Sequence, residues 1–575
     1  MLRYFLIVLV VGFGMDQVWS ANTVAIDTRI AAAITKDLSQ QEWQDFRHFL
    51  KALNNKKSYR AYASIISRYL AGESLASEQE ATIYRLLGIY TKLRYGGEAM
   101  AMLRDLVAIP TFKVEGQPQY QNPNIIKIGK EFEKIAAKFN LSFKNIDNRV
   151  FEVTLPGKNN SLIGIHAHVD VVPVNKALWV LKDGTKLDPF TVKTIANRMY
   201  GRGTEDDKNG IIAALYAMKV IKEEKISLWQ TIRLIIDTTE ETGAGAIAYY
   251  LERRPTPPYN LALDGSYPVV IAEKGYGVVM AEFPVRKATG SGAKITALTG
   301  GLATNQIPQS ATATLHADNV KQLQKDIEKL AQQYIAANGS NFSITTTRKG
   351  SELILSVNGV SAHSSQPKSG INPVSRLFGF IDLLRQRIPI QANHITDAAR
   401  YASDNWGLDY YGKKLNIDFE HGFMGPLTAA LTFIGLDDDN LRVAVNLRVP
   451  VGKSLAKLQA EMNQKITRWQ DQHKISMTVD YSLREPMYRD PKGAWVNLLL
   501  DVASENLGIK REFGSSNGGT SAHNLPNGVQ FGLSMPNVKY TGHNANEFKT
   551  IDQFLIDMQI VTEAFVRLGK LKRMQ

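Results

Sequence analysis

The 575-residue sequence contains no cysteine. This absence excludes disulfide bonds and thiolate metal sites, so any metal ion must be bound by histidine, aspartate or glutamate. After residue 20 the sequence also lacks an apolar run of about 20 residues, the length that a membrane-spanning helix requires. We therefore expect no stable membrane insertion once the first segment is removed.

Dense basic clusters are also missing, although the formal net charge is +13. The basic residues are dispersed, and the densest run is only Arg567 to Arg573. No basic run is interleaved with aromatic residues, and no known nucleic-acid-binding signature is present. We interpret the charge as a solvated surface and expect no nucleic-acid partner, with a nucleic-acid binder as a remote alternative.

The first twenty residues are typical of a signal peptide. Arg3 supplies a basic start, and an uncharged apolar stretch follows over residues 4–14. Val18 and Ser20 are small enough for a cleavage site before Ala21. We expect residues 1–20 to be removed and the protein to be exported, either to a periplasm or out of the cell. The alternatives are a buried N-terminal helix or an uncleaved anchor.

The length indicates several domain-sized units. Residues 21–95 have helical patterns and are interpreted as a helical extension, which Gly96 and Gly97 are predicted to end. Strands alternate with helices over 96–285, which predicts an α/β domain with a mainly parallel sheet. Residues 286–490 predict an inserted α+β lid domain of two related halves, and residues 491–575 are expected to complete the first domain.

Five short polar motifs stand out in the sequence. Each has an ordinary structural explanation when it is taken alone, such as a helix cap or a buried hydrogen bond. Four of them lie at the ends of elements in one α/β unit, which is where open α/β sheets bind their ligands. The motifs are His166 to Asp170, Gly201 to Lys208, Thr239 to Gly243, Asp264 and His543.

Together these motifs contribute two histidines and three carboxylates, with one acid to spare. Such nitrogen and oxygen ligands suit two zinc-like ions that share a bridging carboxylate. Neighbouring glutamates such as Glu240 and Glu241 repel each other unless a proton or a cation lies between them. The spare acid matches the general base that a metal-dependent hydrolase needs.

The ordered motifs resemble those of the aminoacylase, carboxypeptidase and dipeptidase family of two-zinc metallopeptidases, and within it the PepV-type bacterial dipeptidases. The resemblance runs from about Leu103 to the C-terminus. It implies that His168, Asp206 and Asp264 bind one zinc ion. His543, Glu241 and the bridging Asp206 would bind the second, and Co²⁺ or Mn²⁺ could replace zinc.

The resemblance also assigns roles around the metals. Glu240 would be the general base, and Asp170 would steady His168. The peptide between Asp206 and Asp207 would be cis. In the lid, Asn305, His363 and Arg448 resemble substrate-gripping residues, and Gly518 and Gly519 resemble a substrate-facing glycine loop.

Two residues depart from the family pattern. Asn209 stands where the family often has glycine, which would reshape a turn. His523 stands where the family often has arginine, so a fixed cation becomes a titratable one, with a possible effect on substrate preference.

We expect the protein to hydrolyse the amide bond of small peptides, dipeptides with free termini above all. An N-acyl amino acid deacylase or a carboxypeptidase is the nearest alternative, and an inactive zinc-binding protein is a remote one. We also expect a monomer, because the 200-residue lid is long enough to supply His363 to the active site of its own chain.

Overall fold

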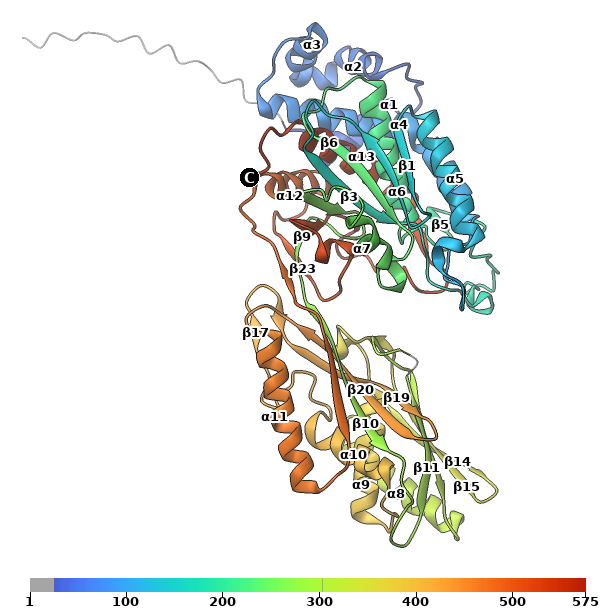
Figure 1. Ribbon diagram of the computed structural model, residues 1–575. Helices are drawn as coiled ribbons and strands as arrows, with labels where there is room; N and C mark the ends of the chain where they lie inside the picture. The colour runs from blue at the N-terminus through green and yellow to red at the C-terminus, as the bar shows by residue number, and fades with distance from the viewer. Residues whose placement is uncertain (1–24, 302) are drawn as a thin grey trace, which may run out of the picture.

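The computed structural model describes residues 25–301 and 303–575. The predicted signal peptide at residues 1–20 lies outside the described part of the chain. Within that part, none of the helices combines the length and the apolar character needed to cross a membrane. The chain forms two bodies, each built around its own sheet (Figure 1).

The first body contains a nine-stranded mixed sheet. The four central strands, β6, β3, β7 and β24, are parallel, as the sequence pattern predicts, and antiparallel strands flank them on both sides. In spatial order the strands are β1 Ser142–Ile146, β2 Val150–Leu155, β6 Thr231–Asp237, β3 Leu162–His168, β7 Tyr259–Ala262, β24 Gly528–Gln530, β9 Val270–Glu273 and β22 Met487–Tyr488, with β23 Gly514–Ser516 also paired to β9.

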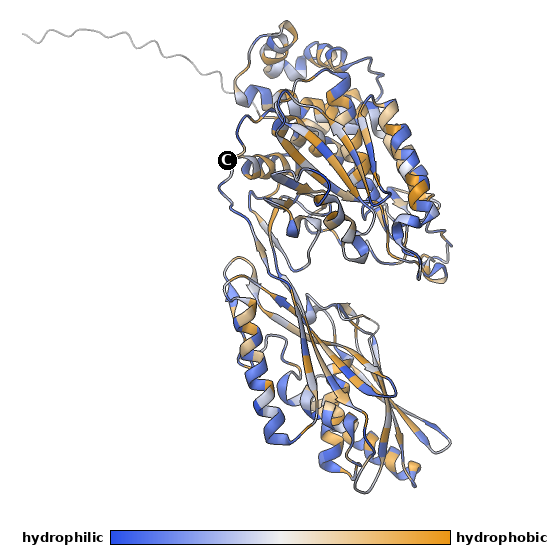
Figure 2. Ribbon diagram, in the orientation of Figure 1, coloured by the Kyte–Doolittle hydropathy of each residue, from blue (hydrophilic) through white to orange (hydrophobic). Residues whose placement is uncertain are grey.

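Helices cover this sheet. Helix α6 (Lys208–Glu223) is buried on nearly all sides. Every residue of β6 is buried too, because helices on both faces of the sheet exclude water from the parallel strands. Figure 2 shows hydrophobic, orange strands and helices at the centre of the body. The helices are α1 Thr28–Leu38, α2 Phe46–Asn54, α3 Ala63–Ala71, α4 Ser77–Val107, α5 Pro123–Lys138, α6 Lys208–Glu223, α7 Gly245–Leu251, α12 Ala494–Leu507 and α13 Ile551–Lys570.

Helix α4 corrects one prediction, because it continues through Gly96 and Gly97 without a break. These glycines do not end the helix. A Cβ atom at Gly96 would lie 2.5 Å from the Leu555 side chain of α13, and one at Gly88 would lie 2.5 Å from the backbone oxygen of Gln559. The glycines therefore let α4 and α13 pack closely, which offsets their low helix propensity.

The helical extension shares the hydrophobic core of the first body. Phe46 and Phe49 of α2 both pack against Tyr90 of α4. Arg85 of α4 forms a buried ion pair with Glu563 of α13. The extension is therefore part of the first body's packing and not a separately folded appendage.

The second body contains an eight-stranded antiparallel sheet. Its two four-stranded halves join where Gly300 pairs with Ile434. In spatial order the strands are β14 Ser343–Lys349, β15 Glu352–Asn358, β13 Ser310–His316, β11 Lys294–Gly300, β19 Thr428–Leu436, β20 Asn440–Val449, β10 Gly275–Pro284 and β21 Thr478–Leu483, and the helices are α8 Val320–Asn338, α9 Pro373–Arg387, α10 His394–Asn405 and α11 Leu455–His473.

The chain crosses between the bodies twice: the first crossing lies around residue 274, between β9 and β10, and the second spans residues 484–486, between β21 and β22. Strand β9 leads directly into β10, so the second sheet begins at Gly275, before the boundary expected at residue 286. On the return, β22 already pairs with β9, before the boundary expected at residue 490. The crossings touch, since a Cβ atom at Gly275 would lie 2.3 Å from the backbone oxygen of Arg484.

Four small sheets of short strands complete the described structure. In the first body they are β4 Lys193–Ile195, β5 Arg198–Tyr200 and β26 Phe548–Thr550, which form one small sheet, and β8 Gly265–Ser266 with β25 Leu533–Ser534. In the second body they are β12 Gln306–Ile307 with β16 Ala362–His363, and β17 Glu420–His421 with β18 Gly425–Pro426.

Candidate active site

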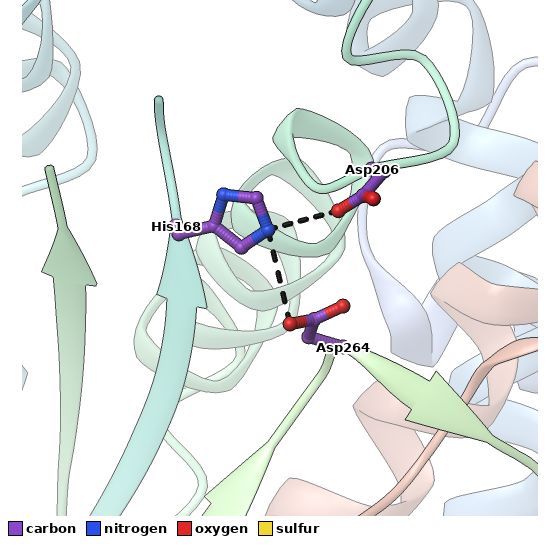
Figure 3. Close-up of side chains that lie close together, drawn as sticks. All are labelled: His168, Asp206 and Asp264. Carbon is purple, nitrogen blue, oxygen red and sulfur yellow. Dashed lines mark hydrogen bonds and ion pairs between the residues drawn. The ribbon is translucent and has the colours of Figure 1, made fainter. Parts of the chain in front are cut away.

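The first group of candidate ligands gathers at the carboxyl ends of neighbouring parallel strands. His168 is the last residue of β3, and Asp264 follows β7, which pairs with β3 in parallel. The Nε2 atom of His168 lies 2.9 Å from Oδ1 of Asp206 and 3.8 Å from Oδ2 of Asp264 (Figure 3). Asp206 reaches this point from the loop that precedes α6.

A second group shares Asp206 with the first. The Nε2 atom of His543 lies 2.9 Å from Oδ2 of Asp206 and 3.0 Å from Oε1 of Glu241. In each group the ligand atoms all lie within 4.8 Å of one another. The structure thus brings together the two groups of three that the family resemblance implies, with Asp206 common to both.

The chemistry of the two groups fits a pair of cations. The ligand atoms are imidazole nitrogens and carboxylate oxygens, which suit zinc-like ions. Burial, and then the negative charge of Asp206, hold the pKa of Asp264 well above its usual range. Burial lowers the pKa of His543, but its hydrogen bonds to Asp206 and Glu241 dominate and raise it to about 11. The carboxylates therefore attract positive charge to this point.

Asp170 holds the loop that carries the two glutamates. Its two carboxylate oxygens accept hydrogen bonds of 3.1 Å from the backbone N–H groups of Glu240 and Glu241. The Nδ1 atom of His168 lies 2.9 Å from the backbone oxygen of Asp170 and 3.5 Å from its carboxylate. Asp170 therefore orients His168 and Glu240 together.

Glu547 positions the Asp206 loop and was not found from the sequence. Its carboxylate is fully buried, pairs with Arg202, and accepts hydrogen bonds from the backbone N–H groups of Gly203, Glu205 and Asp206. The peptide between Asp206 and Asp207 is cis. A single glutamate in a loop gave no sequence signal for this role, because its partners lie more than 340 residues away.

Tyr540 was also missed. Its hydroxyl group donates a hydrogen bond to Oδ2 of Asp206, the oxygen that His543 also approaches, while the side chain remains partly exposed. No pattern in the surrounding sequence singles out this tyrosine.

Two of the lid residues lie side by side in the second body. His363 on β16 pairs with Gln306 on β12, and the N–H group of Ser364 donates to the backbone oxygen of Asn305. Burial lowers the pKa of His363 to about 4, with further contributions from the positive charges of Arg448 and His543. The charge of His543, a metal-ligand candidate of the first body, therefore acts on His363 in the second body.

Arg448 connects β20 to the glycine loop. Its guanidinium donates to the backbone oxygen of Asn517 at 3.1 Å, directly before Gly518, and to Oδ1 of Asn446 at 3.2 Å. Its charged end lies 5.0 Å from the centre of the Tyr276 ring. A Cβ atom at Gly519 would lie 3.3 Å from Oε2 of Glu273, so the loop packs closely against the first crossing.

The two departures from the family pattern lie in different surroundings. Asn209 is fully buried in the first turn of α6, and its side-chain atoms have no hydrogen-bond partner in the described residues. The ring of His523 lies 2.8 Å from the carboxylate of Glu273 and 2.7 Å from the backbone oxygen of Glu485. His523 thus contacts both crossings and forms no hydrogen bond or ion pair with the metal-ligand groups.

The family model for peptidase family M20/M25/M40 matches residues 164–567. The chain is 27% identical over 449 residues to the putative dipeptidase YtjP of Bacillus subtilis, covering 76% of this chain and 89% of that protein. It is also 27% identical over 445 residues to the Beta-Ala-Xaa dipeptidase of Lactobacillus delbrueckii, covering 76% and 88%.

Among solved structures, human carnosine dipeptidase 1 shares the fold, with a TM-score of 0.52 at 12% identity, covering 85% of this chain and 99% of that one. The family model and the dipeptidase relatives confirm the resemblance found in the sequence. The matched residues include every predicted metal ligand and both halves of the second sheet. The chain therefore belongs to peptidase family M20/M25/M40.

Proposed function

We propose that the protein is a dipeptidase that uses two zinc ions to hydrolyse the amide bond of dipeptides with free termini. The observation that carries this proposal is the pair of ligand groups sharing Asp206, with Glu240 beside them on the loop that Asp170 holds. The relatives named as dipeptidases, which cover most of the chain, support the same substrate class.

The ligand groups are His168, Asp206 and Asp264 for one ion, and His543, Asp206 and Glu241 for the other. Two divalent cations held there would supply Lewis acidity and a water molecule of lowered pKa. Asp170 and Glu547 keep the ligands in place, through His168 and through the Asp206 loop respectively.

Glu240 moves the proton in this proposal. Its carboxylate takes a proton from the attacking water and returns it to the nitrogen of the leaving amine. Burial raises the pKa of Glu240 to about 8; the positive charge of His168 opposes this shift, and neighbouring carboxylates add to it. Cations at the ligand groups would lower this pKa towards the range of a general base.

His363 donates a hydrogen bond to the oxyanion that develops on the scissile carbonyl. The N–H group of Ser365 donates to Nδ1 of His363 at 3.2 Å, so in the neutral ring the proton lies on Nε2. A lowered pKa keeps the ring neutral near pH 7, with this Nε2–H group as its donor. Donors of this kind are commonly worth about 3 kcal/mol to the transition state.

Arg448 binds the terminal carboxylate of the substrate. Its side chain is 6% exposed, and no carboxylate in the described residues lies within ion-pair distance of it. Burial without an acidic partner lowers the pKa of Arg448 to about 10. A carboxylate that entered with the substrate would supply the missing negative charge and accept two parallel hydrogen bonds.

A hydrolysis panel separates this proposal from its alternatives. Metal-loaded protein is offered free dipeptides, N-acyl amino acids and longer peptides, and the rates are compared. We expect dipeptides to be hydrolysed fastest. A preference for acylated amino acids would identify a deacylase, and successive release of C-terminal residues from longer peptides would identify a carboxypeptidase.

We also propose that the chain is exported and acts as a monomer. Export rests on the sequence of residues 1–20, and N-terminal sequencing of the protein from its native cells should begin at Ala21. The monomer proposal rests on one chain holding both the ligand groups of the first body and His363 of the two-halved second body.

A further inference from the structure

Lys274 is a second buried cation beside Arg448. It lies in the first crossing between the bodies and is 4% exposed, and Arg448 is 6% exposed. The ammonium group donates a hydrogen bond of 2.6 Å to the backbone oxygen of Pro426 and has no other hydrogen-bond partner among the described residues. A lysine buried to this degree is almost always paired with an acid.

The strand register places the two cations close together. Pro426 lies two residues before Thr428, and Thr428 pairs with Arg448 across β19 and β20. Tyr276, two residues after Lys274, also pairs with Arg448 across β10 and β20. Both residues also hold the glycine loop, since the N–H group of Lys274 donates to the oxygen of Ser516 and Arg448 donates to Asn517.

No acid of the described chain neutralises this pair. Neither cation has a carboxylate oxygen within 4.0 Å among the described residues, although many other lysines and arginines there are paired with acids, from Arg29–Asp27 to Lys570–Glu80. Glu273, the residue before Lys274, is occupied by Thr520, His523 and Gln530. Burial and the positive charge of Arg448 lower the pKa of Lys274 to about 8, so it remains mostly charged at neutral pH.

Two buried positive charges exceed what one carboxylate can neutralise. A dipeptide with an uncharged second side chain brings one carboxylate, which the proposed function assigns to Arg448. A dipeptide with aspartate or glutamate as its second residue brings another negative charge near the first. Placing that charge against Lys274 would replace an unpaired buried ammonium group by an ion pair.

We propose that Lys274 forms a subsite for an acidic side chain, so that the protein prefers dipeptides whose second residue is aspartate or glutamate. This inference rests on the proposed function, because it takes the terminal carboxylate to lie at Arg448. The ligand class is therefore a dicarboxylate, with one carboxylate at each cation.

The test compares isosteric substrates on metal-loaded full-length protein. Ala-Glu is compared with Ala-Gln, and Ala-Asp with Ala-Asn, by kcat/KM. We expect the acids to be favoured by roughly tenfold to a hundredfold, as for a charge-assisted contact. In Lys274→Met this ratio should fall to about one, and in Lys274→Arg a preference for the acids should persist.

Lys453→Met is the matched control. Lys453 lies in the same body and is paired with Glu461, so its loss should leave the ratio unchanged. Because removal of an unpaired buried ammonium group relieves a desolvation cost, Lys274→Met should melt at the same temperature as the unmodified protein or higher. Equal rates on acids and amides by the unmodified protein overturn the subsite. An equal loss of kcat/KM on acids and amides in Lys274→Met also overturns it.

A binding measurement keeps the test independent of hydrolysis. Glutarate and butyrate, which have two carboxylates and one, are titrated calorimetrically into the unmodified protein and Lys274→Met. We expect glutarate to bind about tenfold more weakly to the variant, and butyrate to bind equally well to both. If glutarate binds more weakly to Lys274→Met as expected but the protein hydrolyses no dipeptide, the proposed function is wrong and the subsite stands. An unchanged glutarate affinity would defeat the subsite.

Discussion

At the residue scale, the proposed chemistry depends on groups whose surroundings set their charge. Glu240 lies among carboxylates in a buried site, and His363 lies near two positive charges. Arg448 is buried without an acid within ion-pair distance among the described residues. In the proposed mechanism, cations would supply Glu240 with positive charge, and a substrate would supply further hydrogen-bond acceptors to His363 and Arg448.

The first prediction concerns the proton acceptor. Glu240→Gln keeps the shape of the side chain and leaves all five metal ligands unchanged. The variant should retain about two metal ions per chain by metal analysis and lose at least about 10²-fold in kcat, the lower end of general-base contributions. Near-normal turnover would remove Glu240 from this role.

The second prediction concerns Arg448. Free dipeptides should be hydrolysed roughly ten to a hundred times more efficiently than their C-terminal amides, because a bidentate charged contact is lost in the amide. Arg448→Ala should narrow this difference, and Arg448→Lys should restore only part of it, since an ammonium group cannot form the paired contact. If the unmodified protein hydrolysed acids and amides equally, the terminal carboxylate would not lie at Arg448.

At the scale of elements, the site depends on contacts between segments that are distant in sequence. The loop before α6 is held by Glu547, which precedes α13, and the glycine loop is held by Lys274 of the first crossing and by Arg448 of β20. Glu547 has four hydrogen-bonding partners for one carboxylate, so the position of Asp206 depends on a residue from the other end of the chain.

The third prediction tests Glu547. In Glu547→Gln, an NH₂ group replaces one of the two carboxylate oxygens. That group then faces other donors, either the Arg202 guanidinium or the three backbone N–H groups. The free energy of unfolding should fall by about 3 to 5 kcal/mol, as for a broken buried pair, and metal affinity should fall about 10- to 100-fold. Urea unfolding and metal retention on dialysis measure these effects. Glu252→Gln, at an exposed glutamate, is the control. Equal unfolding free energies and equal metal retention in the two variants would contradict the role of Glu547 in positioning Asp206.

The fourth prediction is a pH dependence of stability at the crossings. The hydrogen bond to Glu273 raises the pKa of His523 in the folded protein, against the opposing effect of burial, and Arg489 also opposes the shift. The stabilisation is therefore complete below the ordinary histidine pKa of about 6.5 and is lost as pH rises through the raised folded pKa.

Metal-free unmodified protein and His523→Gln are compared by urea unfolding to measure this effect. The difference in unfolding free energy should be about 1 to 3 kcal/mol at pH 5.5 and should shrink by pH 9. His523→Arg should keep its stability at pH 9, because its charge does not titrate. A difference between the unmodified protein and His523→Gln that grew with pH would contradict a charged His523.

At the scale of the whole molecule, the two bodies meet where both crossings, the glycine loop and Arg448 lie together. The ligand groups belong to the first body, and His363 and Arg448 belong to the second. The proposed active site therefore requires both bodies. The described chain holds both, with His363 within electrostatic reach of His543.

The fifth prediction follows from this arrangement. If His363 acts within its own chain, a mixture of inactive His363→Ala and Glu240→Gln proteins should remain inactive. Shared sites between chains would instead restore up to about a quarter of full activity, because each mixed dimer would contain one intact site. Activity of the mixture across a range of concentrations distinguishes these outcomes, and sedimentation gives the mass of the assembly.

The sequence alone located the candidate ligands, because four of the five motifs lie at the ends of predicted strands or helices and all carry side chains that bind hard cations. The family resemblance then assigned each ligand to one of two ions. Strand patterns likewise predicted the parallel centre of the first sheet and the two halves of the second. Gly96 shows the limit of local rules: a glycine pair predicted a break, yet α4 continues because tertiary packing against α13 outweighs propensity.

Only the tertiary structure identified Glu547, Tyr540 and Lys274. Each is a single polar residue without a local motif, and its role depends on partners 334, 341 and 152 residues away for Tyr540, Glu547 and Lys274. Burial and the presence or absence of an opposite charge decide what such a residue does. These quantities are properties of the packed chain, whereas residue type and strand periodicity are already present in the sequence.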